Sequence, residues 1–210
     1  MGRPGLLLIG AGGHAKACID VIEQHGGFDI VGLVGKPEEL GGQCLSHAVI
    51  GTDADLEALA RVHRHALVAV GQITSPTLRV QLYQRAVEAG FELPAIVSPH
   101  AYVSPHAMLG AGSLVMHGAV VNAGARVGRN CILNTRALVE HDVQVGDHCH
   151  LSTGAIVNGN AMIGDGCFIG SGSVVREGIR VGAGCVVGMG LSVRHDLADH
   201  TRFLGEAHHA

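Results

Sequence analysis

Hydrophobic residues recur at every sixth position from residue 97 to residue 193. The seventeen positions of this register all hold an aliphatic side chain: Val97, Val103, Leu109, Val115, Val121, Val127, Leu133, Val139, Val145, Leu151, Val157, Ile163, Ile169, Val175, Val181, Val187 and Val193. A second register, four residues after the first, holds mostly Ala, Ser or Cys. Neither the period of an amphipathic helix nor the alternation of a half-buried strand gives this pattern. One inward aliphatic residue and one small corner residue per six-residue unit predict a parallel β-helix.

The register resembles that of left-handed β-helix proteins built from hexapeptide repeats, in which three units form one triangular coil. Four cysteines of the small register, Cys131, Cys149, Cys167 and Cys185, are spaced by eighteen residues. We therefore expect them to stack as a ladder of reduced thiols at one interior corner. A tetrahedral zinc site would require cysteine pairs at short spacing, so no metal is expected there.

The first 95 residues follow a different pattern, typical of an α/β domain. The predicted elements are strands over 6–9, 30–34 and 67–70, and helices ending near residue 24 and covering 53–63 and 77–89. A strand, a glycine-rich turn and a helix in this order open a nucleotide-binding unit. We expect a Rossmann-like domain, 1–95, joined without a flexible linker to a left-handed β-helix domain, 96–210.

The composition fits this division and narrows the possible partners. Hydrophobic residues make up 47% of the chain but aromatic residues only 3%, so the core must consist of small aliphatic side chains. The net charge is −4 and no cluster of Lys and Arg follows any face, which argues against nucleic acid and anionic membranes as partners. Neither a membrane-spanning run nor a signal-peptide core is found, which favours a cytoplasmic protein.

The glycine-rich turn is the first candidate for chemistry. Gly10-x-Gly12-x-x-Ala15 fits a dinucleotide fingerprint, and the start of a helix there would attract phosphate through its free N–H groups. A nicotinamide-binding unit also needs an acidic residue at the end of the second strand, where this chain has Val34 and Gly35. Pyrophosphate binding without a nicotinamide is therefore favoured, and a turn that needs glycine only for packing is the alternative.

The second candidate lies in the repeats, where Glu140, His141 and Asp142 are consecutive. His141 and Asp142 occupy the third and fourth positions of their hexad, so both side chains can reach the surface. A carboxylate can orient one imidazole nitrogen and stabilise the imidazolium that forms on proton uptake, which is the arrangement of a general base. The chain has 15 histidines, so an exposed histidine without function is the alternative.

Together these features resemble one family. Gly-Ala-Gly-Gly-His-Ala-Lys after the first strand, a short α/β domain, and repeats carrying Asn-Thr-x-x-x-x-Glu-His-Asp with a second His nine residues later are similar to the nucleotide-sugar acetyltransferases. These include the bacillosamine-pathway UDP-4-amino-sugar N-acetyltransferases, the perosamine N-acetyltransferases and the sialic acid O-acetyltransferases. The resemblance covers essentially the whole chain.

The resemblance implies a homotrimer that uses acetyl-CoA and no metal. It implies that the N-terminal domain holds the nucleotide sugar, that acetyl-CoA lies between neighbouring β-helices, and that His141 is the base. The further implied catalytic residues are Asp142, Glu140 and Asn134. The residues implied to bind acetyl-CoA are His150, Gly159, Gly170, Ser171 and Gly188, and those implied to bind the nucleotide sugar are Gly12, Gly13, His14 and Gly71.

Two departures from the family pattern affect these assignments. Val34 and Gly35 stand where an acidic pair commonly ends the second strand, which affects the contacts to uridine and ribose. Residues 205–209 replace a Gly-x-Pro-Ala-Lys motif, which affects a contact to the phosphates of the cofactor.

The leading hypothesis is direct acetyl transfer from acetyl-CoA to the amine of a nucleotide-linked 4-amino-deoxy sugar, because the motif supplies a base but no activated Ser or Cys nucleophile. The first alternative keeps the fold and transfers the acetyl group to a sugar hydroxyl. A zinc-dependent carbonic anhydrase of the γ type is a remote alternative, suggested by His117, His141, His148 and His150. A non-catalytic scaffold is the last alternative.

Overall fold

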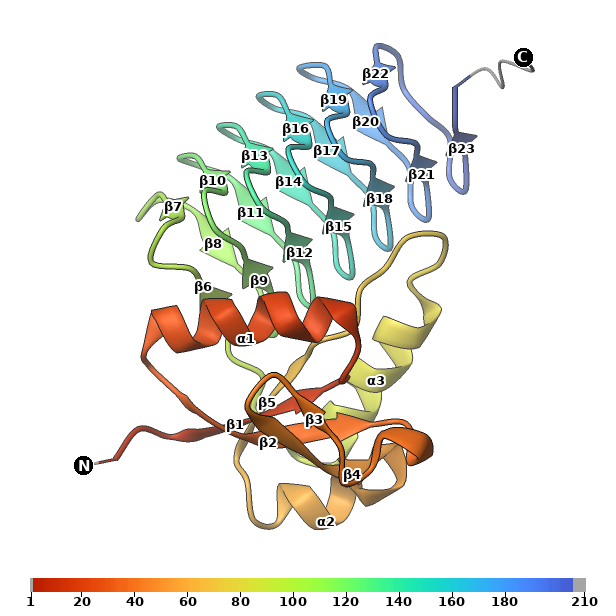
Figure 1. Cartoon of the computed structure of the whole chain (residues 1–210). Coiled ribbons are helices and arrows are strands. Elements are labelled where there is room, and N and C mark those ends of the chain that lie inside the picture. The colour runs from red at the N-terminus through yellow and green to blue at the C-terminus, as the bar shows by residue number, and fades with distance from the viewer. Residues whose placement is uncertain (1, 206–210) are drawn as a thin grey trace.

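A computed structural model of the chain describes residues 2–205 and shows two parts, an α/β layer and a coiled prism (Figure 1). The elements of the first part are β1 (Gly5–Ile9), α1 (Gly13–His25), β2 (Asp29–Gly35), β3 (Gln43–Cys44), β4 (His47–Thr52), α2 (Leu56–Ala60), β5 (His65–Val68) and α3 (Thr77–Glu88). The strands form one sheet in the order β3-β4-β2-β1-β5, parallel except for β3. None of the helices within residues 2–205 has the length and hydrophobicity of a membrane-spanning segment.

The central strand β1 is buried on both sides because both faces of the sheet are covered. Leu6 and Leu8 pack in one cluster with α1, whereas Leu7 and Ile9 pack in another with α2 and α3. Helix α1 ends at His25 and is capped by Gly26, which has a left-handed backbone and donates its N–H to the carbonyl of Ile22.

Two expectations for this part were wrong or incomplete. The helix expected over 53–63 is a 3₁₀ turn, Asp53–Asp55, followed by α2, which ends at Ala60. The Asp55 carboxylate accepts the N–H of Thr52 at 2.8 Å and so fixes a tight first turn. Strands β3 and β4 were not predicted, because their short segments show no long hydrophobic run.

The second part is a left-handed parallel β-helix of two-residue strands that form three faces. The seven-stranded face consists of β6 (Ile96–Val97), β9 (Leu114–Val115), β12 (Ile132–Leu133), β15 (His150–Leu151), β18 (Phe168–Ile169), β21 (Val186–Val187) and β23 (Arg202–Phe203). The six-stranded face consists of β7 (Tyr102–Val103), β10 (Val120–Val121), β13 (Leu138–Val139), β16 (Ile156–Val157), β19 (Val174–Val175) and β22 (Ser192–Val193). The five-stranded face consists of β8 (Met108–Leu109), β11 (Arg126–Val127), β14 (Gln144–Val145), β17 (Met162–Ile163) and β20 (Arg180–Val181).

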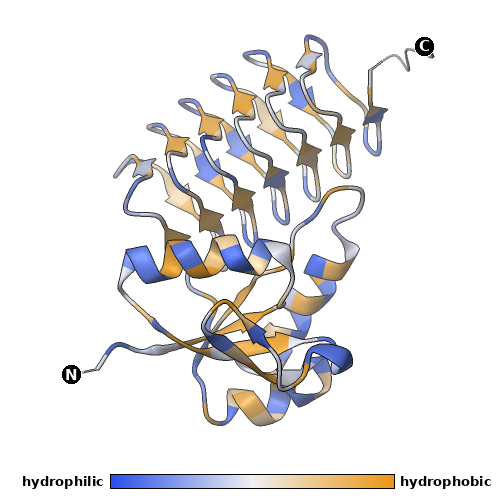
Figure 2. Ribbon diagram, in the orientation of Figure 1, coloured by the Kyte–Doolittle hydropathy of each residue, from blue (hydrophilic) through white to orange (hydrophobic). Residues whose placement is uncertain are grey.

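The chain visits these faces in a constant order, which defines three edges. Residues such as 134–137 turn from the seven-stranded to the six-stranded face at the first edge. Residues such as 140–143 turn to the five-stranded face at the second edge, and 146–149 return to the seven-stranded face at the third. Figure 2 shows mainly hydrophobic strands on the six-stranded face and hydrophilic residues on β11, β14 and β20 of the five-stranded face.

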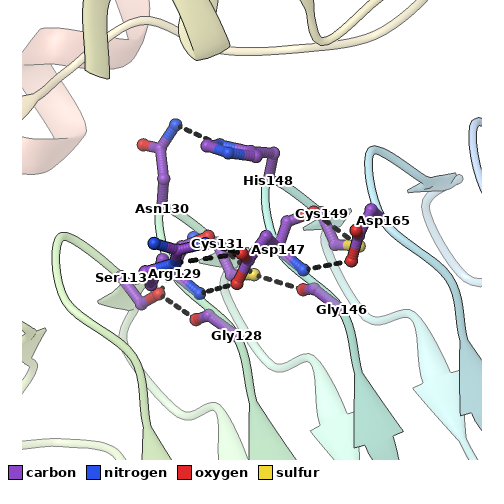
Figure 3. Close-up of polar contacts among 10 residues, drawn as sticks. All are labelled: Ser113, Gly128, Arg129, Asn130, Cys131, Gly146, Asp147, His148, Cys149 and Asp165. Carbon is purple, nitrogen blue, oxygen red and sulfur yellow. Dashed lines mark hydrogen bonds and ion pairs between the residues drawn. The ribbon is translucent and has the colours of Figure 1, made fainter. Parts of the chain in front are cut away.

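The expected cysteine ladder is confirmed at the third edge, and Figure 3 shows two of its members, Cys131 and Cys149. All four thiols are buried, and each lies within hydrogen-bond distance of a carbonyl oxygen of the next coil. Cys131 donates to Gly146 at 3.1 Å and Cys149 to Gly164 at 3.1 Å. Ser113 begins the same column and donates to Gly128 at 2.7 Å, so the thiols have a packing and hydrogen-bonding role that a hydroxyl can also fill.

The two parts meet along the seven-stranded face, over which α1 lies (Figure 1). Cys18 and Ile22 of α1 share a buried cluster with Ile96 and Leu114 of the β-helix. Arg79 of α3 is 1% exposed, and its guanidinium donates to the backbone and side-chain oxygens of Asn130, both at 2.8 Å. This contact joins the two parts through a fully buried charge.

We predict that Cys149→Ala lowers the free energy of unfolding by about 1–2 kcal/mol, from a small cavity and a lost hydrogen bond, and leaves turnover near that of the unmodified protein. Cys149→Ser is the matched control, because Ser113 already occupies the equivalent place in this column. Urea unfolding and a steady-state assay measure both. Loss of turnover in Cys149→Ser, with the fold intact, would contradict a purely structural ladder.

Candidate active site

The second edge carries three consecutive polar residues, Glu140, His141 and Asp142. The two carboxylates contact different parts of His141, one the ring and the other the backbone. Asp142 Oδ2 lies 2.9 Å from His141 Nδ1, and both side chains are exposed, by 66% and 64%. Glu140 Oε2 accepts the backbone N–H of His141 at 3.2 Å and the side-chain amide of Asn122 at 2.9 Å. Asp142 therefore orients the ring and Glu140 holds the backbone. With Nδ1–H donated to Asp142, the His141 Nε2 lone pair is available as a base.

The ring of His141 lies over a glycine of the next coil. A β-carbon on Gly159 would come within 2.6 Å of His141 Nε2, so any other residue there would displace the ring. Asp142 has a left-handed backbone with φ of 60°, which turns its carboxylate back toward His141 and over Gly124. Gly159, predicted to lie beside the cofactor, is thus a direct neighbour of the His141 ring.

A second group lies where the glycine loop meets the seven-stranded face. His150 is 6% exposed, with Nδ1 at 2.6 Å from the Gln72 carbonyl oxygen and Nε2 at 3.1 Å from Asn134 Nδ2. The ring centroids of His14 and His150 are 6.3 Å apart. Burial, aided by the charge of Arg79, lowers the pKa of His14 and of His150 to about 4, so both rings are neutral at neutral pH.

The glycine loop opens onto a cavity of about 600 Å³. Gly12 is the N-cap residue of α1, and no side chain there covers the N–H groups of the first turn. A β-carbon on Gly12 or Gly13 would meet nothing within 4 Å, so the space beside the loop is open. The first-turn N–H groups can therefore reach an anion. The residues lining the cavity are Gly10, Ala11, Gly12, Val34, Gly35, Lys36, Pro37, Glu39, Thr52, Asp53, Ala54, Val70, Leu78, Leu82 and Arg85.

The carboxylates of this cavity come from outside the expected position. Val34 and Gly35 give it an apolar wall, whereas Glu39 and Asp53 supply acidic side chains from the turns after β2 and β4. Gly71, expected to touch the nucleotide sugar, lies beside His14, another residue expected to do so: a β-carbon on Gly71 would lie at an ordinary 3.6 Å from that side chain.

The remaining predicted cofactor residues, Gly170, Ser171 and Gly188, lie in a strip along the first edge. This strip also holds Asn134, predicted as catalytic, and Ser152, because residues 134, 152, 170 and 188 follow one another at intervals of eighteen, one on each coil. Ser152 Oγ and Ser171 Oγ are 2.9 Å apart. A β-carbon on Gly170 would lie 2.5 Å from the carbonyl carbon of Gly188, so contact between coils already requires glycine at position 170.

The structure separates the two histidines that the sequence places nine residues apart. Nine residues are half of an eighteen-residue coil, so His141 lies at the second edge and His150 on the opposite, seven-stranded face. Asn134 lies with His150 and not with His141. One chain therefore carries two separate groups of candidate residues, here called half sites, on opposite sides of the prism.

Several residues of these groups had not been predicted. Asn122 holds Glu140, the Gln72 carbonyl holds His150, and Arg79 fixes α3 against Asn130. The position of Asn122, eighteen residues before Glu140, is a usable signal within the repeat. A contact through a backbone carbonyl, such as that of Gln72 with His150, leaves no signal in the sequence.

Comparisons with known proteins place the chain in a family. Residues 5–86 match the family model described as the PglD N-terminal domain, and residues 161–194 match the hexapeptide repeat of succinyl-transferase. PerB from Caulobacter crescentus, solved with CoA and GDP-perosamine, is 34% identical with a TM-score of 0.87, covering 94% of this chain and 92% of that chain. The acetyltransferase domain of PglB from Neisseria gonorrhoeae FA1090, solved with acetyl coenzyme A, is 35% identical with a TM-score of 0.86, covering 95% of each chain.

A further structure, WeeI from Acinetobacter baumannii AYE, is 21% identical, covers 90% of this chain and 93% of that chain, and shares the fold with a TM-score of 0.69. A comparison with curated protein sequences found no match.

The fold, the glycine loop and the matches to PerB and to the acetyltransferase domain of PglB define the class of protein, a hexapeptide-repeat acetyltransferase. The chain belongs to the family of nucleotide-sugar amino acetyltransferases that includes perosamine N-acetyltransferase.

Family membership overturns the carbonic anhydrase and scaffold alternatives. Each histidine invoked for zinc has its own partner: His117 Nε2 lies 2.8 Å from Asp20 Oδ2, and His148 Nδ1 lies 2.9 Å from Asn130 Nδ2. No group of three potential metal ligands occurs among residues 2–205.

The buried histidines predict that the protein loses stability in mild acid. The pKa of His14 and of His150 is about 4 in the folded chain and near 6.5 when unfolded, so between these values the unfolded chain binds more protons. Their contribution is complete above the unfolded pKa and is lost as the pH falls toward 4, by up to about 1.4 kcal/mol per pH unit for each histidine. Urea unfolding at about pH 7 and about pH 5 should show this decrease.

His150→Gln removes one titrating ring, so its free energy of unfolding should depend less on pH than that of the unmodified chain. His106→Gln, at an exposed histidine, is the matched control and should keep the full dependence. An equal pH dependence in all three proteins would contradict the assignment.

Proposed function

We propose that this protein transfers the acetyl group of acetyl-CoA to the amine of a nucleotide-linked 4-amino-deoxy sugar. The observation that carries the proposal is the exposed His141–Asp142 pair, with no partner for His141 Nε2 among residues 2–205, in a chain similar to an enzyme solved with CoA and GDP-perosamine. The domain 1–95 would hold the nucleotide sugar at Gly12, Gly13 and His14. The domain 96–210 would hold acetyl-CoA along the strip of the first edge; residues 206–210, including His208 and His209 of the altered motif, lie outside the described chain.

The chemistry requires one proton transfer and one acyl transfer. The amine nitrogen attacks the thioester carbon while His141 Nε2 takes a proton from that nitrogen, and the resulting imidazolium is stabilised by Asp142. The tetrahedral intermediate collapses, the C–S bond breaks, and the proton passes from His141 to the departing CoA sulfur. The products are an amide and CoA-SH, and the base returns to its starting state.

The two half sites support an active site between subunits. Outward residues of the six-stranded face form a partly exposed apolar stripe: Val120, Leu138, Ile156 and Val174. This face lies between the first and second edges, so packing it around a threefold axis brings the second edge of one subunit to the first edge of the next. His141 of one chain would then face Asn134, His150 and His14 of its neighbour, and we propose a homotrimer.

The role of His141 predicts a rate defect that alkaline pH repairs. His141→Ala should lower kcat by roughly 10²- to 10⁴-fold, the usual range for a positioned base, and change the Kd for acetyl-CoA little. Residual activity should recover as the pH rises, because more of the amine acceptor is then already deprotonated. A hydroxyl acceptor, with its far higher pKa, would show no such recovery, so the same series separates N- from O-acetylation.

His195→Ala is a matched control within the same column. His195 lies three coils beyond His141 and is also followed by an aspartate, but Asp196 accepts the N–H of Arg180 at 2.9 Å. This variant should keep the full rate. Full turnover of His141→Ala at neutral pH would refute the mechanism.

The subunit arrangement predicts complementation between two inactive variants. His141→Ala and Asn134→Ala damage different half sites, so random mixed trimers should regain roughly a quarter of the intact sites. Unfolding and refolding the two together, followed by an assay, measures this recovery. No recovery on mixing would contradict the shared site.

The same arrangement predicts a trimer in light scattering, and Leu138→Asp, on the apolar stripe, should disrupt it. A monomer at assay concentration would contradict the shared site.

A further inference from the structure

Two backbone groups fix the direction of a hydrogen-bond chain through Asn134 and His150. The Gln72 carbonyl oxygen can only accept, so the His150 Nδ1 that lies 2.6 Å away must carry hydrogen. The Thr135 N–H can only donate, so the Asn134 atom 2.8 Å from it must be the oxygen. The amide nitrogen of Asn134 therefore faces His150 Nε2, at 3.1 Å.

These directions leave one arrangement of the protons. Asn134 Nδ2 is a donor, so His150 Nε2 must be its acceptor and cannot carry hydrogen. The ring is the neutral tautomer with hydrogen on Nδ1. Burial lowers the pKa of His150 to about 4, and the facing groups, Arg79 and the neutral ring of His14, add no negative charge that would restore the proton.

The Gln72 carbonyl is held firmly enough to impose this tautomer. Gln72 is 3% exposed, and its side-chain amide donates to the carbonyls of Gly166 and Cys167, both at 3.3 Å. The preceding segment is fixed because the Arg79 guanidinium donates to the carbonyl of Val70. The carbonyl cannot turn away from His150 without breaking buried hydrogen bonds of both parts of the molecule.

We propose that Asn134, and not His150, presents the N–H donor to the acetyl carbonyl oxygen, and that His150 is a positioning residue for this amide. One hydrogen of Asn134 Nδ2 is used by His150, and no other partner of this nitrogen is found among residues 2–205. Asn134 is partly exposed at the first edge, whereas His150 is buried. The donor would stabilise the oxyanion that forms when the amine adds to the thioester. This role rests on the acetyl transfer proposed above.

The tautomer can be measured without any assay of turnover. In ¹⁵N-histidine-labelled full-length protein, the His150 signals are identified by their absence in His150→Gln. Nδ1 should show the protonated type of signal and Nε2 the unprotonated type, unchanged between about pH 5.5 and about pH 8. A protonated Nε2 at neutral pH would overturn the proposal, whatever reaction the protein catalyses.

Asn134→Asp tests the role of the donor. The oxygen facing Thr135 is retained, but a carboxylate oxygen replaces the N–H that faces Nε2, so His150 should take up a proton on Nε2 near neutral pH. Loss of one oxyanion donor should lower kcat by roughly 10²- to 10³-fold, with little change in the Kd for CoA. Gln144→Glu makes the same amide-to-carboxylate change on the exposed five-stranded face and should alter neither the signals nor the rate.

The outcomes separate the two proposals. If His150 were the donor to the acetyl group, Asn134→Asp would strengthen it by protonation and the rate would persist, which contradicts our assignment. If the NMR signals are as expected but neither the unmodified protein nor any variant acetylates an amino sugar, the proposed function is wrong while the tautomer stands. A Kd for CoA that weakens as much as kcat falls would reduce Asn134 to a binding residue and overturn its role as an oxyanion donor.

Discussion

The backbone pairing of strand residues eighteen apart along the chain constrains everything else in this structure. Ile132 pairs with His150 and His150 with Phe168, and the same register continues on all three faces up to Val193. Only the last pairs, such as that of Val186 with Arg202, are sixteen residues apart. Because each coil up to Val193 repeats this register, a side chain is placed by its position modulo eighteen. An insertion of one residue would move every following side chain to another place on the prism. The thiol ladder, the strip of the first edge and the His141 column all follow from this register.

A second constraint comes from the polar groups buried between the two parts. Arg79 keeps its charge beneath α3 because backbone oxygens and Asn130 surround its guanidinium. The same charge and the same burial keep His14 and His150 neutral. A neutral ring can act as a fixed acceptor, and its partners then set its tautomer. The interface between the two parts therefore also determines the protonation of His14 and His150 and the tautomer of His150.

The β-helix was predictable because its register is written directly in the chain, and the expected left-handed fold is confirmed. The start of the α/β part was predictable for a similar reason, since β1 is a compact apolar run followed by glycines. Strands β3 and β4 were not, because β4 is a strand through its pairing with β2, and β3 through its pairing with β4, rather than through hydropathy. Of the site, the His141–Asp142 pair could be found from sequence. The separation of His141 from His150 follows from the half-coil spacing, but the contacts of Gln72, Arg79 and Asn122 depend on tertiary packing.

The two His-Asp pairs of this chain show why a motif alone does not define a base. His141 and His195 share one column, yet only Asp142 has the left-handed backbone that turns its carboxylate toward the neighbouring ring. Asp196 instead accepts a backbone N–H of the previous coil, and no hydrogen bond from it to His195 is found in the described chain. Height along the prism adds a second distinction. Along the prism axis, His141 lies at a height between Asn134 and Ser152. In a neighbouring subunit with a parallel axis, the glycine loop beside His150 would lie at this height. His195 lies three coils further along the axis and would not face that loop.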